Sequence, residues 1–304
     1  MSHLIINHLK SMILYQNQNV DTNLILTHPN MRKILFASLL VLLPVCLQAA
    51  AESVMIPGSV GKLAAVIQIP DKAEGDIPFV LLLHGFMGEK GGSLETCMAN
   101  ALEKRGIASV RFDFNGHGES EGDFQDMTVL NEIEDVKCVI RYIREKYDVK
   151  RIALSGHSQG GVVASMAAGE LGGDTISAVV LMAPAAVLRD DAIRGNTMGK
   201  SYDPLDPPEY VEMWNGKRLG RNFIKTAFSL PIYETAIKYQ GPACIIHGTG
   251  DRIAPYDYGE RYHYIWKRSE LHIINGDDHG FSHNFEQVIC VAVDFLAGNL
   301  KYYR

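Results

Sequence analysis

Short apolar runs and amphipathic segments alternate along most of the chain. The apolar runs occupy residues 63–69, 78–84, 108–114, 151–155, 178–182, 243–247 and 271–274. Residues 79–83 are apolar without a break, whereas a strand with one face in water would alternate between apolar and polar positions. The pattern therefore predicts strands covered by helices on both faces, and an α/β chain with a mostly parallel, doubly wound sheet.

The segments between these runs have the spacing of amphipathic helices. In residues 126–147 apolar side chains recur every three or four positions, at Val129, Ile133, Val136, Ile140 and Ile143. Further helices are expected at 160–170, which is rich in Ala and Gly, and at 284–300 near the C-terminus. Such spacing places one apolar face against the sheet and one charged face in water.

The interval from residue 184 to residue 239 interrupts this alternation. It lies between two predicted strands and is rich in proline and aromatic residues. An unstructured loop of this length is uncommon inside a compact domain, so we expect a small cap subdomain over the carboxyl edge of the sheet. The domain predicted for residues 52–304 thus combines a core with this cap, and both are expected to share the function.

The N-terminal region has the pattern of a targeting segment. Arg32 and Lys33 precede an apolar run over residues 34–47, and small alanines follow it. The run is shorter than the roughly 20 residues of a membrane-spanning helix, which argues against an anchor. Residues 31–51 are therefore predicted to be a signal peptide that is cleaved before Glu52, so that the protein is secreted or periplasmic.

Residues 1–30 carry no targeting pattern and no amphipathic face, so Met31 is expected to be the true start within the 1–51 leader. A lipoprotein signal through Cys46 is the alternative. Val45 occupies a position where such signals require a very small residue, which argues against it.

Composition narrows the class of partner. The chain has 304 residues, of which 47% are hydrophobic, and a formal net charge of -6. It has no run of Lys and Arg in the predicted core, so it lacks the electrostatic footprint for nucleic acid or an anionic membrane. The expected partner is a small neutral or aromatic molecule, and the oligomeric state is not indicated. The cysteines outside the leader lack C-x-x-C spacing and are expected to be buried free thiols.

A G-x-S-x-G sequence at residues 156–160 is the first sign of chemistry. It lies between the strand predicted at 151–155 and the helix predicted at 160–170, which is the context of a nucleophile elbow. The glycines permit a strained turn that exposes the Ser158 hydroxyl, and the helix N-terminus places positive dipole near a developing oxyanion. Ser158 is therefore predicted to be a nucleophile, and a chance loop serine is the alternative.

A serine hydroxyl needs a base within hydrogen-bond reach and a third group that orients the base. In enzymes with this elbow the acid and then the base follow the serine along the chain. Asp251 follows the strand at 243–247, and His279 follows the strand at 271–274. These positions predict Ser158, Asp251 and His279 as a catalytic triad.

Three nearby residues offer alternatives. His283 lies one helical turn beyond His279 and is the rival base. Asp277 and Asp278 could be taken for the acid, but a carboxylate directly before the histidine is poorly placed to reach its Nδ1, so both are interpreted as loop-forming and solvated. A metal site from His279, His283 and these aspartates is a further alternative, but no H-x-x-x-H spacing on a predicted helix with an adjacent Glu appears, so no metal is expected.

An oxyanion hole requires two backbone N–H donors, one directly after the nucleophile and one after an early strand. Gln159 is predicted to supply the first donor. Phe86 is predicted to supply the second, because His84, Gly85 and Phe86 follow the unbroken apolar run at 79–83. Gly also marks ordinary strand ends, which is the alternative interpretation of this tripeptide.

With these residues placed, the chain resembles the bacterial cinnamoyl (feruloyl) esterases of the α/β-hydrolase superfamily over roughly residues 55–300. The likeness rests on residues 84–86, 112–118, 156–161 and 183–186, and more specifically on the cap segments 191–197 and 230–234. It implies the α/β-hydrolase fold and hydrolysis of esters between hydroxycinnamic acids and sugars or small alcohols. It also implies a cap that binds the phenolic ring, and no cofactor.

The cap carries the expected substrate contacts. Asp191 lies in the segment that most resembles these esterases and could accept a hydrogen bond from a ring hydroxyl, while a solvated residue or a helix cap is the alternative. Trp214 is expected to be an apolar wall for the ring. Phe223 stands where similar enzymes often carry a tyrosine, and Met198 where a glutamine can occur.

Other activities on the same fold remain open at this point. A triad does not distinguish ester from amide cleavage, so a general acyl esterase or a serine peptidase is the enzymatic alternative. A non-catalytic hydrolase-like binding module is the alternative outside catalysis, although such a module would normally lack part of the triad.

Overall fold

The computed structural model describes residues 51–71 and 76–301, with the backbone alone at residue 301. The predicted leader therefore lies outside the described residues, except for its last residue. That residue, Ala51, opens the strand β1 (Ala51–Pro57) and pairs with Gln68 of β2 (Lys62–Gln68).

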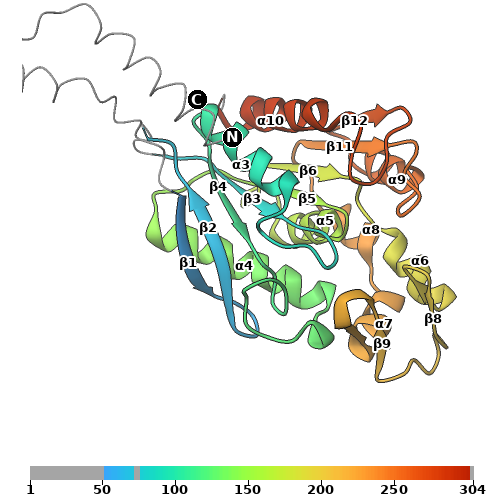
Figure 1. Ribbon diagram of the computed structural model, residues 1–304. Helices are drawn as coiled ribbons and strands as arrows, with labels where there is room; N and C mark the ends of the chain where they lie inside the picture. The colour runs from blue at the N-terminus through green and yellow to red at the C-terminus, as the bar shows by residue number, and fades with distance from the viewer. Residues whose placement is uncertain (1–50, 72–75, 302–304) are drawn as a thin grey trace, which may run out of the picture. The chain divides into compact units, whose positions relative to one another are not determined.

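An eight-stranded sheet forms the centre of the described structure (Figure 1). Its strands follow the order β1, β2, β4 (Ala108–Phe112), β3 (Phe79–Leu83), β5 (Ile152–His157), β6 (Ala178–Met182), β11 (Ala243–Gly248) and β12 (Ser269–Ile274). From β4 to β12 neighbouring strands are parallel, whereas β2 is antiparallel to both β1 and β4. The predicted α/β fold with a mostly parallel sheet is confirmed. The missed strand, β1, is a largely exposed edge strand and so lacks an apolar run.

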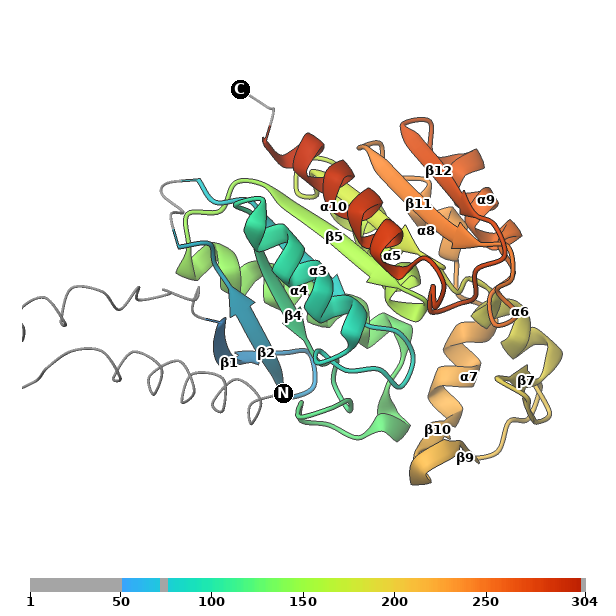
Figure 2. The same ribbon diagram turned by 45° about the horizontal axis from the view of Figure 1, so that its top comes forward.

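Helices cover both faces of this sheet. They include α3 (Ser93–Lys104), α4 (Val129–Lys146), α5 (Gln159–Leu171), α9 (Asp257–Ile265) and α10 (Phe285–Lys301). Along β3, Leu81 belongs to the apolar cluster of α4 and α5, and its neighbour Val80 to the cluster of α3 and α10. Burial on both faces explains why the sequence of β3 does not alternate. Figure 2 shows α3 and α10 across one face.

A capping box sets the start of α4, three residues later than the spacing predicted. Thr128 accepts a hydrogen bond from the Asn131 backbone N–H, and the Asn131 side chain accepts one from the Thr128 N–H. The preceding residues Phe124–Asp126 form a short 3-10 turn, η1. The five apolar positions predicted for this helix are all buried. Across residues 51–71 and 76–301, no helix is long and apolar enough to cross a membrane.

The interval between β6 and β11 has structure of its own. It contains α6 (Val187–Arg194), β7 (Asn196–Thr197), β8 (Lys200–Ser201), β9 (Tyr210–Glu212), η2 (Trp214–Gly216), β10 (Arg218–Gly220), α7 (Arg221–Phe228) and α8 (Ile232–Ala236). Leu219, Phe223 and Ile224 from this interval join the main apolar cluster. Figure 2 shows α6 and α7 beside the carboxyl ends of the parallel strands, which is where a cap was expected.

The four described cysteines are free thiols as expected, but most of them are not buried. Cys97, Cys138, Cys244 and Cys290 are free, but Cys97 and Cys290 are exposed and only Cys244 is fully buried. Cys290 lies in α10 among apolar residues, yet the helix is amphipathic and turns this position toward solvent. Apolar neighbours in sequence therefore did not imply burial.

Candidate active site

Ser158 stands at the sharp turn between β5 and α5. Its backbone has φ 56° and ψ -122°, a strained conformation for a residue with a side chain. A Cβ at Gly156 would lie 2.1 Å from the Gly160 carbonyl oxygen, and one at Gly160 would lie 2.3 Å from the Leu83 carbonyl oxygen. Only glycine fits at both positions, so the G-x-S-x-G sequence forms the strand–turn–helix elbow that it predicted.

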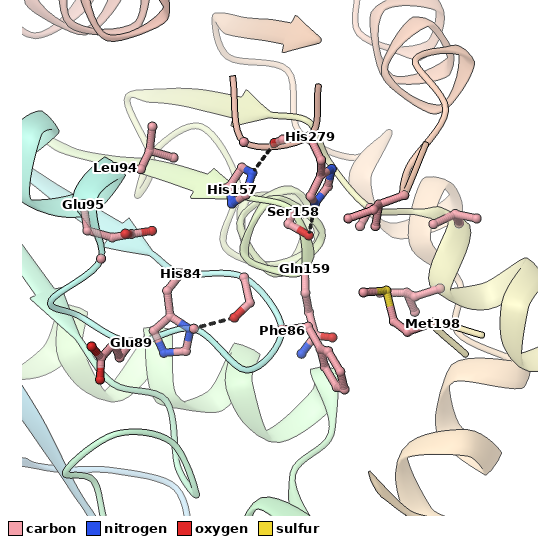
Figure 3. Close-up of a pocket in the computed structure, with 18 of the residues that line it drawn as sticks. His84, Phe86, Glu89, Leu94, Glu95, His157, Ser158, Gln159, Met198 and His279 are labelled. Carbon is pink, nitrogen blue, oxygen red and sulfur yellow. Dashed lines mark hydrogen bonds between the residues drawn. The ribbon is translucent and has the colours of Figure 1, made fainter. Parts of the chain in front are cut away.

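Loops after β11 and β12 bring the predicted acid and base to this serine. His279 Nε2 lies 2.8 Å from Ser158 Oγ (Figure 3). On the other side of the ring, His279 Nδ1 lies 2.7 Å from Asp251 Oδ2. Because the Asp251 carboxylate accepts the Nδ1–H, the neutral imidazole presents Nε2 as the acceptor for the Ser158 hydroxyl. The three residues thus form one continuous hydrogen-bonded chain.

Asp251 is buried and receives several donors. Its Oδ1 accepts the backbone N–H groups of Ile253 and Ala254, each at 2.9 Å, and its Oδ2 lies 3.1 Å from His247 Nε2. Burial acts to raise the pKa of Asp251, but the hydrogen bonds from His247 and His279 outweigh it and hold this pKa below its ordinary value. Asp251 is therefore ionised at neutral pH.

His247 is a positioning residue that the sequence reasoning missed. The sequence pattern places His247 only as the last residue of the apolar run at 243–247. In the structure its fully buried ring contacts the Asp251 carboxylate and lies 2.8 Å from the Ala254 carbonyl oxygen. The signal was a histidine at a buried strand position four residues before the acid.

The residues that offered alternatives have other partners. The exposed ring of His283 places its Nδ1 3.2 Å from Asp277 Oδ1. Asp277 also accepts the backbone N–H groups of His283 and Asn284, and Asp278 accepts that of Ser282. Both aspartates shape the loop as interpreted, but Asp277 is fully buried and not solvated. The N–H groups of His283 and Asn284, which directly precede α10, take the place of water around its carboxylate.

Two further histidines, the buried His84 and the partly buried His157, hold loops of the site. His157 Nε2 lies 2.8 Å from the carbonyl oxygen of His279. His84 Nε2 accepts the Phe114 backbone N–H, which leaves Nδ1–H to donate to the Gly85 carbonyl oxygen. Burial lowers the pKa of each of these histidines to about 4, so both rings are neutral near pH 7. They position the loops that carry the predicted base and the predicted oxyanion donor.

The two predicted oxyanion donors flank Ser158. Gly85 brings the β3–α3 loop close, since a Cβ there would lie 2.9 Å from the Ser158 Cβ. Phe86 follows on this loop, and Gln159 opens α5. Within the described part of the chain, neither backbone N–H donates a hydrogen bond to another protein group. Both donors are therefore available to a substrate oxygen.

A cavity of about 430 Å³ opens above Ser158 between the core and the interval that precedes β11. Phe223, which is almost fully buried, lines this cavity. The exposed Met198 lines it as well (Figure 3). The prediction that Trp214 forms an apolar wall for the substrate ring is wrong, because Trp214 does not line this cavity. In the η2 turn the neighbouring Met213 takes the buried position, and Trp214 stays 45% exposed beneath the Lys200 ammonium.

Asp191 also lines the cavity, and its side chain is 23% exposed. It is the fifth residue of α6, whose N-cap is Ala186, so the helix-cap alternative is wrong. Burial raises the pKa of Asp191, while a 3.0 Å ion pair with the exposed Arg194 opposes this effect. Arg194 engages Oδ1 of Asp191, whereas Oδ2 has no hydrogen-bond donor among the described residues and can accept from a ligand.

This topology and this hydrogen-bonded serine define a serine hydrolase of the α/β-hydrolase type. A family model described as serine aminopeptidase, S33, matches residues 77–202. Est1E from Butyrivibrio proteoclasticus, solved with ferulic acid, is 30% identical with a TM-score of 0.77, and the match covers 81% of this chain and 98% of Est1E. A second Est1E structure is 27% identical with a TM-score of 0.74, covering 82% and 99%. The chain belongs to the α/β-hydrolase superfamily.

Curated relatives match over shorter stretches. An uncharacterized 31.7 kDa protein from the traX-finO intergenic region of Escherichia coli is 37% identical over 103 residues, which are 33% of this chain and 35% of that protein. A lysophosphatidylserine lipase from Danio rerio is 24% identical over 195 residues, 64% of this chain and 48% of the lipase. The chain spans about a third to a half of these relatives, so its substrate must be argued from the site.

Proposed function

We propose that this chain hydrolyses carboxylic esters through an acyl-enzyme on Ser158. The observation that carries the proposal is the hydrogen-bonded chain from Ser158 through His279 to Asp251, with distances of 2.8 and 2.7 Å. A serine hydroxyl becomes an effective nucleophile when a positioned imidazole takes its proton as the new bond forms.

The residues of the site account for each step. Ser158 Oγ attacks the ester carbonyl carbon while His279 Nε2 takes the hydroxyl proton and Asp251 stabilises the imidazolium. The backbone N–H groups of Phe86 and Gln159 bind the oxyanion of the tetrahedral intermediate. His279 then protonates the leaving oxygen, the carbon–oxygen bond breaks and the alcohol departs. Water repeats the sequence on the acyl-enzyme, releasing the acid and restoring Ser158.

The proposed acyl group is a hydroxycinnamate such as ferulate, caffeate or p-coumarate, bound on the cap side of the cavity. Leu188 and Phe223 supply apolar surface there for a ring, and Asp191 supplies an acceptor for a ring hydroxyl. The 30% identity with Est1E, which was solved with ferulic acid, supports this assignment.

Asp191→Ala tests the acyl assignment. Loss of a hydrogen bond to a charged acceptor costs roughly 1.5–3 kcal/mol, so kcat/KM for methyl ferulate should fall by about 10- to 150-fold. Methyl cinnamate has no ring hydroxyl and should respond little. Asp190→Ala is the matched control, because Asp190 accepts from Tyr258 and does not line the cavity. Equal losses on both esters, or none on either, would contradict the assignment.

Other activities on this fold are separated by a substrate panel. The serine aminopeptidase description of the matching family model favours a peptidase as the second candidate. Purified protein should be assayed on methyl ferulate, p-nitrophenyl butyrate and an aminoacyl amide. Highest kcat/KM on methyl ferulate is expected; preference for butyrate would indicate a general acyl esterase, and preference for the amide a peptidase.

Covalent labelling tests catalysis itself. A fluorophosphonate probe should label the wild-type protein on Ser158, and Ser158→Ala should abolish the labelling. A wild-type protein that takes up no probe would indicate a hydrolase-like binding module.

A further inference from the structure

The cavity has a second side, away from the cap. The β3–α3 loop and the first turn of α3 line it with Glu89, Leu94 and Glu95, next to His84 and His157. Figure 3 shows these residues on the side of Ser158 opposite Met198. If the cap side holds the acyl group, this second side is the space left for the alcohol that departs.

Glu95 is a buried carboxylate that faces this space without a cationic partner. It is 7% exposed, and among the described residues its side chain accepts a hydrogen bond only from its own backbone N–H. Figure 3 shows its carboxylate pointing into the cavity. Burial raises its pKa, and the charge of Arg111, which does not line the cavity, opposes this effect only in part. A buried carboxylate with so little compensation is stabilised by a cation placed beside it.

No cation on the cavity wall supplies this compensation. The lining residues include the acids Glu89, Glu95 and Asp191, and none of them is a Lys or Arg. The nearby ammonium group of Lys90 is already paired with Asp113 and Glu119. The flanking rings of His84 and His157 are neutral, because burial lowers the pKa of each to about 4. The acidic groups on the alcohol side of the cavity therefore have no fixed cation beside them on the cavity wall.

We propose that Glu95, assisted by the more exposed Glu89, selects the leaving alcohol by charge and favours a cationic alcohol over a neutral one and a neutral one over an anionic one. This inference rests on the proposed ester hydrolysis and adds the chemistry of the alcohol to it. Charges a few ångströms apart in a partly desolvated cavity interact strongly enough to separate such substrates.

The alternative role for Glu95 is structural. It lies in the first turn of α3, whose N-cap, Gly92, has no side chain, so its carboxylate stabilises the helix N-terminus. That role predicts a loss of stability when Glu95 is replaced, and it predicts no change in the ranking of alcohols. The ranking is therefore the readout that separates the two roles.

The test uses three esters of one acid, chosen as the acyl group that the substrate panel shows to be hydrolysed fastest. The alcohols are choline, 3,3-dimethylbutanol and isethionate, which are similar in shape. Choline carries one positive charge, 3,3-dimethylbutanol is neutral and isethionate carries one negative charge. The wild-type kcat/KM should fall in this order, with about 10- to 100-fold between the cationic and the anionic ester at low salt. Added salt should reduce the difference in kcat/KM between the three esters, because it screens the charges.

Glu95→Gln should reduce the ratio of kcat/KM for the cationic ester to kcat/KM for the anionic ester by about tenfold. Glu89→Gln should reduce this ratio by less, because Glu89 is exposed. Glu145→Gln, on the exposed surface of α4 and outside the cavity lining, is the matched charge control and should leave the ratio unchanged. A thermal unfolding curve of each variant reports on the helix-capping role.

Each outcome decides one question. Hydrolysis of all three esters at similar kcat/KM, or an unchanged ratio in folded Glu95→Gln, overturns the inference and leaves the proposed function intact. Absence of hydrolysis of any ester, with no fluorophosphonate labelling, overturns the proposed function instead. A wild-type ranking in the stated order that collapses in Glu95→Gln supports the inference.

Discussion

At Asp251 a competition between burial and hydrogen bonding decides the charge of one carboxylate. Burial favours the neutral acid, but donors from His247, Ile253 and Ala254, together with His279, favour the anion and prevail. The same residue therefore stays ionised where a buried acid would normally be neutral. An anion at this position is what holds the Nδ1–H tautomer of His279.

Asp251→Asn is expected to leave a folded protein with turnover reduced on the order of 10⁴-fold, because the imidazole then presents the wrong tautomer to Ser158. Steady-state kinetics on the best ester and a circular dichroism spectrum would check this. A near-wild-type Asp251→Asn beside a crippled Asp278→Asn would show that the acid was assigned wrongly.

Glu132 is the opposite case. It is almost fully buried behind Gln159, whose side-chain amide donates to its two carboxylate oxygens at 3.0 and 2.9 Å. Burial raises the pKa of Glu132 to about 8; the Gln159 hydrogen bond opposes the shift and Asp135 adds to it. At pH values between the ordinary pKa of 4.5 and about 8, Glu132 keeps a proton in the folded state that it releases in the unfolded state.

Stability of the wild-type protein should therefore fall as pH rises through this window, by up to about 1.4 kcal/mol per pH unit from this group. Glu132→Gln removes the titration and should flatten that slope. Urea unfolding of both proteins at several pH values between about 5 and 9 measures it. Parallel stability curves for the two proteins would contradict the assignment of a raised pKa.

At the scale of the element, α10 illustrates how a loop and a helix are joined. Asp277 lies near the start of the loop that carries His279, and it accepts the N–H groups of His283 and Asn284, which directly precede the helix. Burial acts to raise the pKa of Asp277, but these hydrogen bonds lower it below its ordinary value. The carboxylate thereby ties the predicted base to a helix packed on the sheet.

Asp277→Ala should lower the free energy of unfolding at pH 7 by about 0.5–2 kcal/mol, the usual cost of losing such a cap. Because the pKa of Asp277 is lowered in the folded state, the Asp277 carboxylate stabilises the fold at pH values above its ordinary pKa of 3.8. This stabilisation is lost as the pH falls through the folded-state pKa. The gap between wild type and variant should therefore close in acid. Denaturant unfolding at neutral and acidic pH checks this, and a gap that widens in acid would refute it. Asp278→Ala, at a partly exposed position, should cost less.

At the scale of the whole molecule, the predicted leader and the described fold share one residue, Ala51 of β1. We propose that residues 31–51 are removed on export, so that the mature protein is secreted or periplasmic. Removal up to Ala51 would leave the remaining residues of β1 paired with β2.

Expression from Met31 should then yield an exported protein whose N-terminus lies between Ala50 and Glu52. Mass spectrometry of the mature protein decides this. Retention of residues before Met31, or a lipid on Cys46, would contradict the proposal.

The sequence by itself determined the elements and the order of the chemical residues. An unbroken apolar run predicted the buried strand β3, and three- and four-residue spacing predicted α4, because both periodicities follow from local backbone geometry. The elbow around Ser158 could also be predicted, because its glycines answer steric needs within a few residues. Asp251 and His279 could be placed because each follows a predicted strand, and parallel strands end at the same edge of a sheet.

Only the tertiary structure decided which side chains share a space. It buried Asp277 against a helix start, left Trp214 outside the cavity and set His247 beside the acid. It also turned Glu95, an ordinary acidic residue in a first helical turn, into part of the cavity wall. Burial and charge at these positions depend on contacts between segments far apart in the chain, and no local pattern encodes those contacts.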